Sequence, residues 1–277
     1  MGADRTWMEA TRVNAPVEAG IAPFVLSRTD GDVCHLTLNR GASYNPLSRD
    51  MIAALQAELT RVAADGSARC VVLGANGKGF CAGHDLKELR AHNDLAWQRE
   101  LFAACNALML SITQIPQPVI ARVHGIATAA GCQLVSMCDL AVASETARFA
   151  LPGVNVGVFC TTPAVGVGRN IGRKRVMEML LTGEPVDAAT ALAWGLVNRV
   201  VPEAELDGAV SSLVKLITAR SRAVIAGGKQ AFYRQMDLGL EPAYGLAAEA
   251  MACSLLEPGA HEGIDAFVGK RPPRWPD

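Results

Sequence analysis

Residues 69–86 read RCVVLGANGKGFCAGHDL and carry a short apolar run directly into a loop of small residues. The run 69–75 is apolar and is followed by glycine, which is typical of a buried strand. Residues 119–134, VIARVHGIATAAGCQL, repeat the order with a strand, a loop beginning at Gly125 and a helix from about Ala130. Two strand–loop–helix units in one chain predict an α/β fold.

The residues on either side extend this alternation of strands and helices. Residues 33–39 (VCHLTLN) alternate between apolar and polar side chains, which is the pattern of a strand with one buried face. Ser48 can cap a helix over 49–64, whose apolar residues recur at helical spacing. A helix over 97–114 and a strand over 139–143 are expected next. The repeated order favours a largely parallel sheet.

The pattern changes after about residue 200, where helical spacing replaces the short apolar runs. Pro242 and Pro258 punctuate this stretch. We expect a flexible N-terminal arm over 1–20, a core over 21–200 and a helical C-terminal region over 201–277. Within that last region, helices are expected over 205–221, 223–237, 241–256 and 260–269.

Composition excludes several classes of protein. The 277-residue chain has a formal net charge of −1, and half of its residues are hydrophobic. Such a charge gives no long-range field to attract nucleic acid or an acidic membrane surface, so neither is expected as a partner. No apolar stretch in the sequence approaches the ~20 residues that a membrane span needs.

Eight cysteines are scattered along the chain, several of them in apolar runs, such as Cys70. None forms a CxxC pair or a zinc-like cluster with histidine, so we expect reduced, buried thiols and no metal site. The first 20 residues carry Asp4, Glu9 and Glu18, unlike an acid-poor transit peptide. These features predict a cytoplasmic protein.

The loops at 77–86 and 124–133 place small residues where a strand turns into a helix. Small side chains let a ligand approach the backbone, and free N–H groups at a helix start carry a partial positive charge. Two such N–H groups aimed at one oxygen form an oxyanion hole. Small residues at such turns also serve simply for tight packing, so either loop alone is weak evidence.

Taken together, the two loops resemble the signature of the crotonase (enoyl-CoA hydratase/isomerase) family. The first, GFCAGHDL over 79–86, is similar to the family pattern A-F-x-A-G-x-D followed by an apolar residue. The second, GIATAAGCQL over 125–134, is similar to G-x-x-x-G-G-G-x-E-L, and Cys138-Asp139 follows as in the family. Further matches extend the resemblance over nearly the whole chain.

The resemblance implies a crotonase-type spiral of strand–strand–helix turns with a C-terminal helical subdomain that assembles homotrimers or dimers of trimers. It implies an acyl-CoA or enoyl-CoA thioester as ligand and no other cofactor. The backbone N–H groups of Cys81 and Ala130 would hold the thioester oxygen.

The resemblance also assigns further contacts to the substrate. They are Ala82, Gly83, His84, Asp85 and Leu86 in the first loop, Tyr44 beside the acyl group, and Arg40 and a neighbouring subunit's Lys270 at the phosphates. Arg40 and Lys270 are equally explained as ordinary solvated charges.

Three residues of the first loop admit other roles. His84 could titrate near neutral pH and serve as an acid or base. Cys81 could act as a nucleophile if a helix N-terminus favoured its thiolate. Asp85 could instead cap the helix that starts after it.

Two positions depart from the family pattern. The family's hydratases handle water with two glutamates, which fall here on Gln133 and Gly153. A glutamine amide can hold a water but cannot take its proton, and glycine offers no side chain. The runs 128–134 and 152–157 most resemble a divergent branch, the enoyl-CoA hydratase domain-containing protein 3 type.

Three functions therefore stay open. The first is a hydratase- or isomerase-like enzyme of fatty acid metabolism, a lyase or isomerase with a non-standard acid–base set, for which isomerisation, thioester hydrolysis and decarboxylation are candidate reactions. The second is a non-catalytic acyl-CoA-binding or regulatory protein that still holds the thioester. The third, with less support, is a purely structural oligomer.

Overall fold

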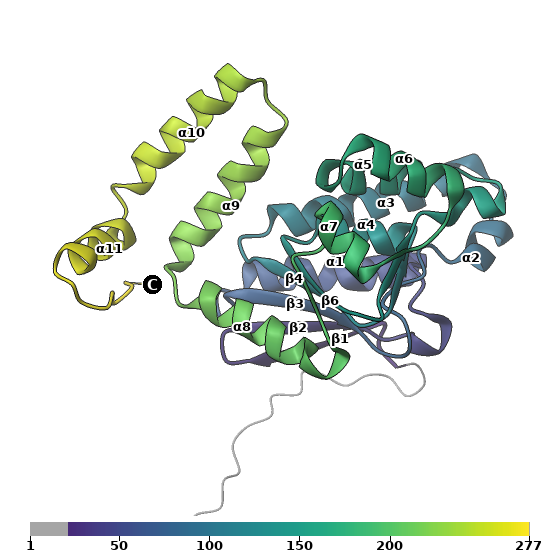
Figure 1. Cartoon of the computed structure of the whole chain (residues 1–277), viewed down its shortest axis with the longest axis horizontal. Helices are drawn as coiled ribbons and strands as arrows, with labels where there is room; N and C mark the ends of the chain where they lie inside the picture. The colour runs from purple at the N-terminus through teal and green to yellow at the C-terminus, as the bar shows by residue number, and fades with distance from the viewer. Residues whose placement is uncertain (1–21, 277) are drawn as a thin grey trace, which may run out of the picture.

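The structure is a computed structural model that describes residues 22–276. The arm expected over 1–20 lies outside the described residues. Figure 1 shows a sheet wrapped by helices, from which a long helical hairpin extends. That hairpin and the last helix are α9 (Arg222–Met236), α10 (Leu240–Ser254) and α11 (Pro258–Val268).

The larger sheet forms the centre of the fold. Its strands are β1 (Val25–Asp30), β2 (Val33–Leu38), β3 (Cys70–Ala75), β4 (Val119–Val123), β6 (Leu140–Ser144) and β9 (Arg199–Val201), in the spatial order β1-β2-β3-β4-β6-β9. β1 and β2 form an antiparallel hairpin, and the other neighbouring pairs are parallel. The alternation predicted near the N-terminus is confirmed in β2, where Cys34, Leu36 and Leu38 are buried.

A smaller sheet gives the fold its spiral character. It contains β5 (Ile126–Thr128), β7 (Arg148–Ala150) and β8 (Val186–Asp187). β5 follows β4 and pairs in parallel with β7, which follows β6. A strand of the large sheet is thus followed by a strand of the small one and then by a helix, which confirms the expected strand–strand–helix turn.

Three long helices cover the larger sheet: α1 (Arg49–Ala64), α3 (Leu95–Gln114) and α8 (Leu206–Thr218). α1 and α3 pack on one face with Leu36 and Leu73. α8 packs on the other face against Cys70 and Val72. Because successive strand residues point to opposite faces, the run 70–73 serves both cores, which explains its continuous apolar character.

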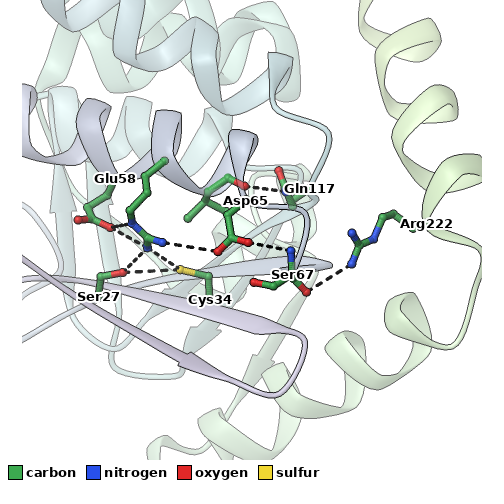
Figure 2. Close-up of polar contacts among 9 residues, drawn as sticks. Ser27, Cys34, Glu58, Asp65, Ser67, Gln117 and Arg222 are labelled. Atoms are coloured by element: carbon green, nitrogen blue, oxygen red, sulfur yellow. Dashed lines mark hydrogen bonds and ion pairs between the residues drawn. The ribbon is translucent and has the colours of Figure 1, made fainter. Parts of the chain in front are cut away.

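Polar side chains fasten the C-terminal end of α1 to its surroundings (Figure 2). Arg61 donates to Glu58 at 2.9 Å and to the Ser27 hydroxyl on β1 at 2.7 Å. The buried Gln117, which precedes β4, donates its side-chain amide to the Val62 carbonyl at 2.9 Å. These bonds hold α1 against both β1 and the start of β4.

Shorter helices follow the loops and the smaller sheet. They are η1 (Gly41–Ser43), α2 (Leu86–Ala91), α4 (Ala130–Met137), η2 (Pro152–Val156), α5 (Thr161–Asn170), α6 (Arg173–Thr182), α7 (Ala188–Trp194) and η3 (Glu203–Glu205). α4 packs against both α3 and α5. This packing surrounds the start of α4, where the second small-residue loop ends.

A buried polar cluster fastens α9 to the core. Lys229 on α9 donates to Asp139 at 2.7 Å and to the carbonyls of Ile112 and Gln117 at 2.8 Å each. Tyr233 donates to the second oxygen of Asp139 at 2.9 Å. We call Lys229, Asp139 and Tyr233 the anchor cluster, because it ties the C-terminal helices to the ends of α3, β4 and β6.

Candidate active site

The two small-residue loops lie side by side, joined by backbone hydrogen bonds. The N–H groups of Phe80 and Cys81 donate to the Ile126 carbonyl at 2.9 and 3.1 Å. The Thr128 N–H donates back to the Cys81 carbonyl at 2.9 Å. Cys81 and Ala127 thus form an isolated parallel bridge. The bridge brings the start of α2 next to the start of α4.

Two glycines permit this close approach. A Cβ on Gly83 would lie 2.9 Å from the Ala129 Cβ and 3.2 Å from the Ala130 nitrogen. A Cβ on Gly131 would overlap the Cys81 carbonyl. Gly83 also has a φ of +88°, which L-residues with side chains rarely adopt. Any side chain at either position would push the loops apart.

Asn45 holds the first loop in place. Its side chain is fully buried, and its amide nitrogen donates to the carbonyls of Asn76 and Gly79 at 2.8 and 3.0 Å. Its side-chain oxygen accepts the Arg40 N–H at 2.7 Å. The run Asn45-Pro46-Leu47 is among the further matches to the family, but the sequence alone did not identify Asn45 as a positioning residue.

The structure contradicts the expectation that Cys81 is an oxyanion donor. Its N–H already donates to the Ile126 carbonyl, so a ligand cannot use it. The Cys81 side chain is also fully buried, and burial raises the pKa of its thiol to about 12. The thiolate nucleophile considered from the sequence is therefore wrong as well, because the group stays protonated at neutral pH.

The backbone N–H of His84 in the first loop has no acceptor among the described residues. The Gly83 carbonyl accepts the Leu47 N–H at 2.7 Å. Because a trans peptide holds its C=O and N–H on opposite sides, the N–H of His84 points away from Leu47. Within residues 22–276 it donates to no protein acceptor. The same holds for the N–H of Ala130, the first residue of α4, among the described residues.

Ala129, the residue before α4, adopts a strained backbone conformation. Its φ of 50° and ψ of −119° lie in a region that glycine adopts far more readily. The Ala129 N–H donates to the Ala150 carbonyl at 2.9 Å, which helps to hold this conformation. The turn leaves the Ala130 N–H at the first position of α4, where a partial positive charge favours a negative ligand atom.

Gln133 is buried without a partner. It lies one turn into α4 and is 4% exposed. Its side chain makes no hydrogen bond in the described part of the chain, and its Oε1 is inaccessible to solvent. An unsatisfied buried polar group costs about 1–3 kcal/mol. This cost is explained if a ligand or a bound water meets the amide.

Gly153 lies in η2, where its surroundings leave no room for a side chain. A Cβ there would be 2.7 Å from the Val158 carbonyl oxygen and 2.9 Å from the Cys160 Sγ. The thiol of Cys160 therefore fills the space that a side chain at position 153 would enter. A carboxylate could be placed here only if residues 157–160 moved.

The His84 imidazole is half-buried and packs against α3. Its ring meets that of Phe102 edge to face, with centroids 5.1 Å apart. Its Nε2 is inaccessible and has no hydrogen-bond partner among residues 22–276. Burial lowers the pKa of His84 to about 4, so the ring is neutral at physiological pH. The expectation that it titrates near neutrality is wrong, because no nearby carboxylate offsets the burial.

The remaining predicted residues of the first loop divide by exposure. Ala82 and Leu86 are exposed on the surface beside the site. The Asp85 side chain accepts the N–H groups of Lys87 and Glu88 at 2.9 and 3.2 Å, which confirms it as the N-cap of α2. Its carboxylate therefore stabilises the helix that follows the donor at His84.

The predicted phosphate contacts have different surroundings. The Arg40 guanidinium donates to the carbonyls of Ala22 and Pro23 at 2.7 and 3.0 Å and stacks 3.7 Å from the Phe24 ring centre. Arg40 is thus committed to the entry of β1, which contradicts a free phosphate contact. Lys270 is exposed after α11. Tyr44 is half-exposed beside Gly79, and its carbonyl accepts the Ala82 N–H at 2.9 Å.

Neither a metal site nor a membrane helix is found in the described chain. Within residues 22–276, no three His, Cys, Asp or Glu side chains gather where they could hold a metal ion. No helix in the same range combines the length and the apolar character that crossing a membrane requires.

Comparison with known proteins identifies the family. The family described as enoyl-CoA hydratase/isomerase matches residues 28–277. A crystal structure of an enoyl-CoA hydratase from Mycobacterium smegmatis is 53% identical and superposes with a TM-score of 0.90, covering 92% of this chain and 99% of that one. The crystal structure of human enoyl-CoA hydratase domain-containing protein 3 is 42% identical, with a TM-score of 0.88 over 91% of this chain and all of that one.

Curated relatives carry the name of the same branch. Enoyl-CoA hydratase domain-containing protein 3, mitochondrial, from Xenopus laevis is 43% identical over 263 residues, which are 95% of this chain and 90% of the relative. These similarities confirm the branch resemblance. They also overturn the predicted cytoplasmic location, because the Xenopus, rat, mouse and human relatives are named mitochondrial. The prediction rested on reduced, buried thiols and on the acidic residues Asp4, Glu9 and Glu18, and neither feature identifies a compartment.

The two paired loops, the spiral of strands and the matches along nearly the whole chain agree, and the chain belongs to the enoyl-CoA hydratase/isomerase (crotonase) family.

Proposed function

We propose that this chain binds an acyl-CoA or enoyl-CoA thioester and holds its carbonyl oxygen with the N–H groups of His84 and Ala130. The observation that carries the proposal is the pair of N–H groups that find no acceptor among residues 22–276, on two loops whose close approach Gly83 and Gly131 permit. A thioester carbonyl that receives two hydrogen bonds is polarised, and its enolate is stabilised more than the thioester itself.

The magnitude is sufficient for catalysis. Removing one such donor typically costs about 2.7–4 kcal/mol of transition-state stabilisation. Burial of the surrounding side chains strengthens the effect, because hydrogen bonds to developing charge gain strength where water is excluded. The proposed reactions are hydratase- or isomerase-like steps of fatty acid metabolism that pass through an enolate or a related oxyanion.

The acid–base groups differ from the usual pair of the family's hydratases. We propose that Gln133 and Gly153 stand at the positions of the two glutamates, so proton transfer needs another group or an external base such as bicarbonate. The structure also explains why restoring both glutamates is unpromising. Gln133→Glu keeps the length of the side chain, whereas a side chain at Gly153 would collide with Val158 and Cys160.

A second candidate function is non-catalytic acyl-CoA binding. It is favoured by the same observation, since an amide and a glycine cannot exchange a proton at the two family positions. The two candidates share the hydrogen bonds from the N–H groups of His84 and Ala130 to the thioester carbonyl, which we call the thioester grip. They differ only in turnover.

A combined binding and turnover screen tests both. Acyl-CoA and enoyl-CoA thioesters should raise the melting temperature well above the value with free CoA, because ligand that binds only the folded state stabilises it. Turnover of any member of the panel supports the enzyme, and binding without turnover supports the second candidate. If no thioester shifts the melting temperature, the thioester grip itself is refuted.

We also propose that the C-terminal helices assemble homotrimers or dimers of trimers. α9–α11 present large apolar side chains to solvent in the single chain, among them Phe232, Leu240, Tyr244, Leu256 and Phe267. Such a surface is unusual on a monomer and marks a contact between proteins. In the assembly, Lys270 after α11 would reach the CoA phosphates bound by a neighbouring subunit. Light scattering that reports a monomer would contradict the assembly.

A further inference from the structure

A cavity of about 740 Å³ lies on the face of the larger sheet that α8 covers only in part. Its floor comes from β1 to β4, and one of its walls comes from α8. Sites for small molecules commonly have this size. The lining contains neither His84 nor Ala130, so the cavity is separate from the thioester grip.

The register of the strands leaves a gap in the floor of this cavity. Thr37 on β2 pairs with Gly74 on β3. The next pair in the register of β3 and β4 brings Gly74 beside Arg122, and a Cβ on Gly74 would lie 3.8 Å from Cδ of Arg122. Because neighbouring strands are about 4.8 Å apart, the Cα atoms of Thr37 and Arg122 stand roughly 10 Å apart across the gap. Gly74 has no side chain to fill it.

The sides of the gap are apolar. Leu26 on β1 pairs with Thr37, Val72 lies two residues before Gly74 on the same face of β3, and Val210 faces them from α8. A short hydrocarbon body can therefore lie over Gly74 without burying a polar group.

Arg122 offers hydrogen-bond donors beside the gap. Its side chain is 26% exposed, and its Nε donates to Asp207 on α8. Its terminal N–H groups have no acceptor within residues 22–276. The hydroxyls of Thr37 and Ser211, which line the same cavity, also have no partner in the described part of the chain. The planar fork of a guanidinium matches the two oxygens of a carboxylate.

Two histidines line the cavity and add no charge that would hold an anion. Burial lowers the pKa of His35, so its ring is neutral at pH 7. The His124 Nε2 donates to the Gly77 carbonyl at 2.8 Å. Its Nδ1, which is buried and has no partner among the described residues, therefore carries a lone pair and cannot donate to an anion.

The charges of the cavity restrict the charge of its ligand. Arg28 is paired with Asp30 at 3.2 Å, Arg122 is paired with Asp207, and Glu203 lies exposed at one end. Three carboxylates face two guanidiniums, so a ligand with two or more negative charges is repelled. A single carboxylate can approach the terminal N–H groups of Arg122 from the side that Asp207 does not occupy.

We propose that this cavity is a second binding site, which takes a small molecule with one carboxylate and a short apolar body. Arg122 holds the carboxylate, with the hydroxyls of Thr37 and Ser211 beside it. The apolar body lies over Gly74 between Leu26 and Val210.

Ligand-observed NMR titrations of the full-length protein test the site, with and without butanoyl-CoA. The probes are hexanoate, 1-hexanol, which has the same chain without the charge, and inorganic phosphate. We expect hexanoate to bind at least about tenfold more tightly than 1-hexanol, the gain expected of hydrogen bonds to a charged group. Phosphate should bind more weakly than hexanoate, and butanoyl-CoA should not displace hexanoate.

Two variants and a matched control assign the binding to the cavity. Arg122→Met should weaken hexanoate binding about tenfold or more. Gly74→Val should weaken it as well, because its side chain fills the gap while Arg122 keeps its charge. Arg199→Met removes another arginine of the same sheet, on β9 and outside the lining, and should leave binding unchanged. Melting temperatures show that the variants are folded.

Four results would overturn the proposal. They are hexanoate that does not bind at millimolar concentrations, phosphate that binds more tightly than hexanoate, displacement of hexanoate by butanoyl-CoA, and equal affinity for hexanoate in the wild type and the folded Arg122→Met variant. If Gly74→Val does not fold, the comparison of Arg122→Met with Arg199→Met still decides.

Discussion

The polar groups of the anchor cluster and those of the candidate site differ in whether their hydrogen bonds are made within the protein. In the anchor cluster, Lys229 has three hydrogen-bond acceptors, and Asp139 accepts from Lys229, Tyr233 and the Val119 N–H, the last at 2.6 Å. At the candidate site, by contrast, Oε1 of the buried Gln133 and Nε2 of the half-buried His84 are inaccessible to solvent and bond nothing in the described chain.

This difference separates structural groups from functional ones. A buried polar group that serves the fold is usually bonded within the fold, because an unsatisfied one destabilises it, although Oε1 of Gln117 and Oγ of Ser221 are also without a partner among the described residues. A group kept unsatisfied beside a binding site can find its partner in a ligand or a bound water. We therefore expect substitutions in the anchor cluster to lower stability, and substitutions of Gln133 to change binding with little effect on stability.

The largest expected effect on the free energy of unfolding is in the anchor cluster. Lys229→Met removes the cation and leaves the Asp139 carboxylate buried without it, which should lower the free energy of unfolding by about 3–5 kcal/mol. Chemical denaturation measures this loss. The exposed Lys174→Met is the control and should stay within about 0.5 kcal/mol of the wild type. A loss below about 1 kcal/mol for Lys229→Met would mean that the anchor is not a structural cluster.

The next largest effect is a dependence of the free energy of unfolding on pH that comes from His84. Burial lowers the pKa of His84 to about 4, below its usual value of about 6.5 in the unfolded chain. The unfolded state therefore binds a proton more readily. The free energy of unfolding therefore has its full value above about pH 6.5, where His84 is neutral in both states. It falls by up to about 3 kcal/mol as the pH drops to 4, because the unfolded chain takes up a proton that the folded protein does not.

Denaturation curves between pH 4 and pH 7 measure this slope. His84→Phe should remove this part of the slope, whereas His92→Phe, which changes an exposed histidine of the same region, should keep it. Equal slopes in the wild type and His84→Phe would contradict the buried, neutral ring.

A smaller effect on the free energy of unfolding is expected at the turn before α4. Ala129→Gly should raise the free energy of unfolding by about 1 kcal/mol, because glycine adopts the positive φ at this position without strain. The same substitution at the exposed Ala57 inside α1 should have the opposite sign and cost about 1 kcal/mol. Thermal unfolding of both variants gives the comparison, and destabilisation in both would show that Ala129 is not strained.

The smallest effect on stability is expected for Gln133→Leu. The substitution replaces an unsatisfied amide with an apolar group of similar size, so the free energy of unfolding should be unchanged or slightly higher. Gln117→Leu, which breaks the bond to Val62, should lose about 1 kcal/mol. A loss at Gln133 as large as that at Gln117 would show that the two glutamines are equivalent structural groups.

Local sequence patterns predicted much of the fold. Apolar spacing and the Ser48 cap placed the helix over 49–64 where α1 lies, and Ser48 accepts the Met51 N–H as expected. The strand over 119–123 and the helix starting at Ala130 also match. β1 was not predicted, because only its first residue is buried and its sequence therefore lacks alternation.

Contacts between distant segments could not be predicted in this way. The motif located the first loop, but the parallel bridge between Cys81 and Ala127 decides which N–H groups are free, and that register is a property of the folded pair. The donor that we propose is consequently His84 and not Cys81. The bond between Lys229 and Asp139 joins residues 90 positions apart and has no local signal.

The most direct test of the thioester grip at His84 and Ala130 is a pair of dissociation constants measured by calorimetry on the wild-type protein. The ligands are butanoyl-CoA and S-butyl-CoA, a thioether that keeps the chain and the nucleotide but lacks the carbonyl oxygen. Two backbone hydrogen bonds to that oxygen predict that the thioester binds at least about tenfold more tightly. Equal affinity for the two ligands would contradict the grip.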